Sequence, residues 1–204
     1  MANVFALKGH VIQDPPLVQR LLSDPRAGWL WLPLRLWLGY QWIHAALAKV
    51  VDPNWVQTGE ALKGYWARAV AIPETGRPLI SFDWYRSFLQ MMLDAQAYTW
   101  FAKVVAYGEV LVGVALILGA FTGIAAFAGG FMNWNYMMAG SASTNPMLLV
   151  AAFGLLVAWK VAGRIGVDAV LLPLLGRPWS RAGAPPAEQE PVARPARTPV
   201  PAQN

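Results

Sequence analysis

Four long apolar stretches alternate with polar segments along this chain. The apolar stretches are residues 29–51, 98–118, 121–140 and 146–163. A helix needs about 20 residues to cross ~30 Å of hydrocarbon, and each stretch is close to that length. The pattern therefore predicts an all-α integral membrane protein, built as a four-helix transmembrane bundle.

Shorter amphipathic segments separate or follow these stretches. In the connection 52–97, residues 55–71 and 82–93 carry apolar and aromatic side chains at helical spacing, as helices lying on a membrane surface do. They are either a lid or docking surface for a partner, or packing across the mouth of the bundle. Residues 164–176 are too short to span, so we expect an interfacial or re-entrant segment that completes a membrane domain over 29–176.

Charge near the ends of the stretches predicts the orientation. Residues 1–28 contain no apolar run long enough for a cleaved signal peptide, and residues 177–204 form a proline-rich tail. Both ends carry an excess of Lys and Arg, whereas the connection 52–97 is slightly acidic. Because basic residues favour the cytoplasmic side, we expect both termini in the cytoplasm of a prokaryote, with residues 52–97 outside its plasma membrane.

Composition agrees with this class and narrows the chemistry. The chain is 56% hydrophobic and only 13% charged, with 11 Trp, too apolar for an ordinary soluble domain. Its net charge of +5 forms no basic patch of the kind that binds nucleic acid. Nucleic acid is therefore not an expected partner, whereas lipid is expected for a membrane protein. The absence of cysteine excludes iron–sulfur and thiolate metal sites. No haem or nicotinamide motif and no metal site are recognised, so redox chemistry would need another cofactor or a partner.

Charged residues inside the stretches need internal partners. At ~1.5 Å per helical residue, Arg35 lies about 9 Å and Glu109 about 14 Å from the inner ends of their stretches. An unpaired ionisable residue in a span is costly. The sequence therefore predicts a structural ion pair between Arg35 and Glu109, in preference to a ligand or proton site.

A second polar layer lies nearer the outer side. By the same rise, its members lie at roughly 7 to 11 Å depth: His44, Lys103, Asn133 and Asn135, with Tyr136 beside them. Two interpretations remain open, a network that holds the helices together and a ligand site.

Four motifs in order resemble those of the DoxX/DoxD-like family of membrane proteins. They are Arg35-Leu36-x-Leu38-Gly39 followed by Lys49, GEVLVGVALILGAFTGIAA, NY-x-MAGSASTNP, and GRIGVDAVLLPLLG. The resemblance covers roughly residues 29–176 and implies a four-helix transmembrane bundle. It also implies similarity to the large subunit of thiosulfate:quinone oxidoreductase, which passes electrons from thiosulfate to a quinone within an assembly of membrane subunits.

With quinone as the implied cofactor, the outer layer becomes a candidate quinone site. His44 or Lys103 would donate to one carbonyl and Asn133 or Tyr136 to the other. The residues expected to flank the ring are Trp42 and Trp134, and the cations expected to attract thiosulfate are Lys49, Lys63 and Arg68. Whether this chain is itself catalytic is left open. The alternative is a non-catalytic accessory subunit of a larger respiratory or photosynthetic electron-transfer complex.

Overall fold

The computed structural model describes residues 14–175. The predicted proline-rich tail and the first part of the predicted N-terminal segment lie outside the described residues. Within them the chain forms helices and no strand, which confirms the all-α class for this part. The helices are α1 (Pro16–Leu22), the short 3-10 helix η1 (Pro25–Ala27), α2 (Gly28–Val50), α3 (Pro53–Val56), α4 (Glu60–Val70), α5 (Asp83–Asp94), α6 (Tyr98–Leu118), α7 (Thr122–Met138), α8 (Asn145–Val157), α9 (Trp159–Ala162) and α10 (Asp168–Leu174).

The long apolar stretches are helical where the pattern predicts helices. The first three correspond to α2, α6 and α7, with ends within two residues of those expected. The fourth is divided at Ala158 into α8 and α9. The segment 55–71 is also divided, because the chain turns through a left-handed Gly59 (φ +78°) between α3 and α4.

The lengths and compositions of the helices support only part of the predicted membrane architecture. Among the described residues, α6 alone has both the length, 21 residues, and the apolar composition to cross a bilayer. Helix α7 has 17 residues and α8 has 13, and α2 includes several polar side chains. A four-helix transmembrane bundle is therefore not shown by helix length and composition.

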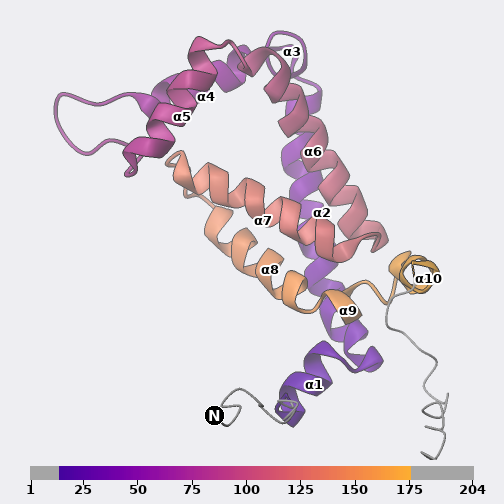
Figure 1. Ribbon diagram of the computed structural model, residues 1–204. Helices are drawn as coiled ribbons and strands as arrows, with labels where there is room; N and C mark the ends of the chain where they lie inside the picture. The colour runs from indigo at the N-terminus through magenta and orange to yellow at the C-terminus, as the bar shows by residue number, and fades with distance from the viewer. Residues whose placement is uncertain (1–13, 176–204) are drawn as a thin grey trace, which may run out of the picture.

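Two helix pairs form the body of the protein. Helix α2 packs along α6 and α7 packs along α8, with α9 against α2 at one end. In Figure 1 the pairs cross near α9 and diverge toward α4 and α5, which lie together at the other end. One apolar cluster packs part of the space between the pairs, and a second includes the buried side chains of α4 and α5.

Close glycine contacts set the relative level of α2 and α6. A Cβ added at Gly39 would lie 3.0 Å from the carbonyl oxygen of Gly113, and one at Gly113 would lie 3.0 Å from the Gly39 oxygen. The backbones thus touch at this crossing, as small residues allow. At this register the Arg35 guanidinium lies against Gly119, just beyond the end of α6.

Candidate functional site

A polar pocket of about 490 Å³ lies between the two helix pairs. Its walls come from α2, α6 and α7, with one residue each from α3 and α4. The turn 141–144 and the start of α8 complete the lining. The helix pairs diverge here and leave a space between them. Side chains from elements far apart in the sequence line this space.

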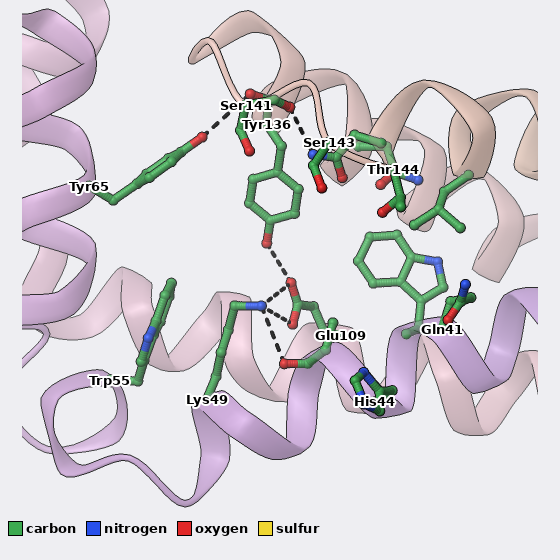
Figure 2. Close-up of a pocket in the computed structure, with 15 residues that line it drawn as sticks. Gln41, His44, Lys49, Trp55, Tyr65, Glu109, Tyr136, Ser141, Ser143 and Thr144 are labelled. Atoms are coloured by element: carbon green, nitrogen blue, oxygen red, sulfur yellow. Dashed lines mark hydrogen bonds and ion pairs between the residues drawn. The ribbon is translucent and has the colours of Figure 1, made fainter.

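Glu109 of α6 is the charged centre of this pocket. Its side chain is 1% exposed. The Lys49 ammonium donates to both carboxylate oxygens, at 2.9 and 2.7 Å, and the Tyr136 hydroxyl donates to Oε1 at 2.6 Å. Figure 2 shows Lys49 and Tyr136 reaching the carboxylate from different helices. The arrangement ties α2, α6 and α7 together through one carboxylate.

Lys49 is held by more than this ion pair. Its ammonium lies 5.4 Å from the centre of the Trp55 ring, within the range of a cation–π contact, and 3.4 Å from the carbonyl oxygen of Ala45. Glu109 balances its charge, and among residues 14–175 no other Lys, Arg, Asp or Glu lines the pocket. The pocket therefore presents no net charge to a ligand.

Asn133 supplies polar atoms that lack a partner. Its side chain is fully buried and lines the pocket, yet neither the amide nitrogen nor the amide oxygen has a hydrogen-bond partner in the described structure. Leaving such a group unsatisfied costs about 1–3 kcal/mol. A polar ligand or a bound water that pairs with Asn133 would remove this cost.

The turn before α8 carries further hydroxyl groups to the pocket. Ser143 and Thr144 are exposed there, and the Asn145 amide donates to the Ser141 carbonyl oxygen at 2.8 Å. On the facing wall, the Tyr65 hydroxyl donates to the Tyr136 carbonyl oxygen at 3.4 Å. Burial raises the pKa of Tyr65 further above neutral pH.

The structure brings together four of the seven residues predicted for the outer layer. Trp42, His44, Asn133 and Tyr136 line the pocket. His44 lies at its edge, exposed, with its ring 5.9 Å from that of Tyr40.

The other three lie elsewhere. Lys103 is exposed on α6. Trp134 is 39% exposed and stacks on Phe131, with ring centres 5.8 Å apart. Asn135 donates to the Phe131 carbonyl oxygen and accepts from the Tyr85 hydroxyl. These three do not line the polar pocket, because adjacent positions on a helix point in different directions even at similar depth.

The predicted ion pair between Arg35 and Glu109 is wrong. Arg35 is buried and donates to the carbonyl oxygens of Ala162 and Ile165, at 2.9 and 2.7 Å. The pair was expected for two helices whose ends lie at the same level. In the structure, Arg35 instead lies beyond the last turn of α6, out of reach of Glu109 and beside Gly119.

Two charged groups were not predicted in these roles from the sequence. They are Lys49, which pairs with Glu109, and Asp168, which lies at the start of α7. The Asp168 carboxylate accepts from the backbone amides of Phe121 and Thr122, at 2.6 and 2.8 Å, and so caps the start of α7. It also interacts electrostatically with Arg35. The available signal was one acid, Asp168, in the otherwise apolar segment 165–175.

The site thus offers a neutral ligand a buried amide, several hydroxyls and aromatic walls from Trp42 and Trp55. Comparison with known proteins identifies no relative: no family model matches the chain, and no curated protein or solved structure does. The family resemblance therefore stays a prediction from the sequence, and the chemistry of the pocket is the remaining guide to function.

Proposed function

We propose that α2, α6, α7 and the α8–α9 segment form a four-helix bundle that spans a membrane several times. The exposed faces of the helices support this. Large apolar side chains recur every three or four residues on the outside of α6 (Trp100, Val104, Tyr107, Leu111, Val114, Leu118) and of α8 (Met147, Val150, Phe153, Val157), each at least 39% exposed. Apolar surface of this extent is unusual on a protein surrounded by water, and it suits contact with lipid.

Within that bundle, the polar pocket binds the head group of a quinone, and the chain is a subunit of a quinone-linked membrane redox system. The observation that carries this proposal is the buried, unpartnered amide of Asn133. Its nitrogen is a donor for a quinone carbonyl. Trp42 and Trp55 supply aromatic surface for the ring.

The charge balance favours a quinone over thiosulfate as the occupant of this pocket. A quinone is neutral, whereas thiosulfate is an anion that would need an uncompensated cation. Lys49 is paired with Glu109, and Lys63 lies 3.1 Å from Glu60 on the surface of α4. Thiosulfate, if it is the electron donor, is oxidised on a partner subunit, and its electrons reach the quinone bound here.

The walls of the pocket also carry exchangeable protons. Reduction of a quinone to a quinol takes up two electrons and two protons. The Tyr136 hydroxyl and the Lys49 ammonium both donate to Glu109, so a connected set of hydrogen-bond donors lies beside the space for the head group. In this proposal the set holds those protons near the quinone oxygens.

The proposed function is tested by purification in a mild detergent and titration with a water-soluble quinone analogue. Because Trp42 and Trp55 line the pocket, a bound quinone should quench tryptophan fluorescence with saturation. The same preparation is assayed for thiosulfate-dependent quinone reduction and for co-purifying chains. Saturable binding supports the proposal, and linear quenching that never saturates contradicts it.

A second candidate, an accessory subunit without a quinone site, is favoured by one observation. Aromatic rings of α7 form a continuous exposed row, from Phe127 through Phe131 to Trp134, with neighbouring centres 6.4 and 5.8 Å apart. Such a row suits contact with another membrane protein. Stoichiometric recovery with a large electron-transfer complex, without saturable quinone binding, would select this function.

A further inference from the structure

A second pocket, of about 480 Å³, lies beneath α4 and α5 and is almost entirely apolar. Its lining includes Trp66, Phe88, Leu89, Val105 and Phe131. Pockets of this size hold small molecules or parts of larger ones. Its composition suits a hydrocarbon.

The apolar pocket adjoins the polar one. Tyr65 and Tyr136 line both. The Tyr136 hydroxyl donates to Glu109 on the polar side, and the Tyr65 hydroxyl donates to the Tyr136 carbonyl oxygen at 3.4 Å and also interacts with Ser141. These two side chains therefore form a wall that the polar and the apolar pocket share.

The apolar pocket also has an outward side. Three of its lining residues, Phe88, Val104 and Phe131, are 41%, 54% and 54% exposed. Val104 belongs to the apolar face of α6 that contacts lipid in the proposed bundle. A chain in this pocket would therefore continue outward among lipid tails.

We propose that the apolar pocket holds the start of the prenyl chain of a lipid quinone whose head group occupies the polar pocket. This inference rests on the proposed function, and it names the substrate class as a tailed membrane quinone. The two Tyr side chains would then lie at the junction of ring and chain.

The head-group chemistry favours a prenyl quinone over a phospholipid. Both have long hydrocarbon chains, but a phospholipid brings a phosphate that needs a free cation. The cation in the polar pocket is Lys49, and Glu109 already neutralises it. The neutral pocket, with its unpartnered Asn133 amide, matches a neutral head group with carbonyl oxygens.

The test compares two quinones with the same ring, one without a tail and one with two isoprene units, in titrations of the purified full chain. Burial of the tail in an apolar pocket should make the tailed quinone bind about tenfold or more tightly. Val104→Trp places a large ring at the pocket and should remove most of this preference. Val114→Trp is the matched control, because Val114 is exposed on the same helix and lines neither pocket.

The outcomes separate this inference from the proposed function. If neither quinone binds saturably, the proposed function fails. If the tail-less quinone binds but the tail adds nothing, or if Val104→Trp and Val114→Trp behave alike, the prenyl site is overturned and the head-group site stands. If added phospholipid competes with the tailed quinone and not with the tail-less one, the pocket holds acyl chains and the inference is again overturned.

Discussion

At the scale of single residues, the ion pair between Lys49 and Glu109 determines the net charge of the polar pocket. Glu109 is 1% exposed, whereas the Lys49 side chain is 19% exposed and long enough to reach water. Removing one partner of a buried pair strands the other charge, at a cost of about 3–5 kcal/mol when the site is fully buried. The two partners should therefore differ in how much their loss costs.

We expect Lys49→Met to lower the free energy of unfolding by about 3 kcal/mol, because Glu109 cannot reach solvent. Glu109→Gln should cost less, since Lys49 can turn outward and the Tyr136 hydroxyl can still donate to the amide oxygen. The double variant should recover most of the loss. A double-mutant cycle measured by denaturant titration in detergent checks this, and additive effects of the two changes would contradict the pairing.

At the α4–α5 end, the buried side chain of Tyr85 should make the stability of the protein depend on pH. Burial raises its pKa to about 12, above the value of about 10 for an unfolded tyrosine. The folded protein therefore keeps this proton at pH values where the unfolded chain loses it. The stabilisation is fully present below about pH 10 and is lost as the pH rises toward 12.

The measurement is the melting temperature of the protein in detergent between pH 9 and pH 12, for the wild type and for Tyr85→Phe. The variant cannot titrate at this position, so its melting temperature should fall less steeply above pH 10. Deprotonation of lysines affects both proteins alike. Parallel curves would show that Tyr85 does not contribute to the pH dependence.

At the scale of elements, Asp168 connects the segment after α9 to the start of α7. Its carboxylate accepts two backbone amides there, and a negative charge at a helix start is favourable. Asp168→Asn should therefore cost about 1–2 kcal/mol of unfolding free energy. Asp83→Asn, at the 86% exposed start of α5, is the matched control and should cost less than about 0.5 kcal/mol. Equal effects of the two changes would contradict the capping role.

Two glycines make a second matched pair. Gly119 has φ +66°, and an added Cβ would collide with the Arg35 guanidinium, so Gly119→Ala should prevent normal folding or sharply lower the melting temperature. Gly64 lies inside α4 with nothing within 4 Å of an added Cβ. Gly64→Ala should raise the unfolding free energy by about 0.5–1 kcal/mol. A tolerated Gly119→Ala would contradict the Arg35 register.

These elements show what the sequence can and cannot predict. The lengths of the apolar stretches predict the positions of α2, α6 and α7. The depths of Asn133 and Tyr136 along their helix predict that both lie beside one polar space. The partner of Glu109 was not predictable in this way, because it depends on how far α2 slides along α6. That register is set by the Gly39–Gly113 contact, which depth counting from the helix ends does not include.

At the scale of the whole molecule, the central structural proposal is a bundle that crosses the membrane several times. The chain contains no cysteine, so single cysteines can report exposure to a membrane-impermeant maleimide on intact cells. The exposed positions Ser23, Thr75 and Ser143 give Ser23→Cys, Thr75→Cys and Ser143→Cys. In a four-span bundle, Thr75→Cys and Ser143→Cys label from outside and Ser23→Cys does not. If α6 were the single span, Thr75→Cys would behave like Ser23→Cys and opposite to Ser143→Cys.

The most direct measurement of the proposed function compares stability and quinone affinity in Asn133→Leu. Leu is close to Asn in size and has no polar atoms to leave unsatisfied, so the unfolding free energy should stay unchanged or rise by about 1 kcal/mol. The affinity for the tail-less quinone should fall at least about tenfold, which corresponds to about 1.4 kcal/mol. Asn54→Leu, at an exposed position of α3 that lines neither pocket, should keep that affinity. A destabilised Asn133→Leu that still binds the quinone as tightly as the wild type would show that Asn133 is a structural residue and that the polar pocket is not the quinone site.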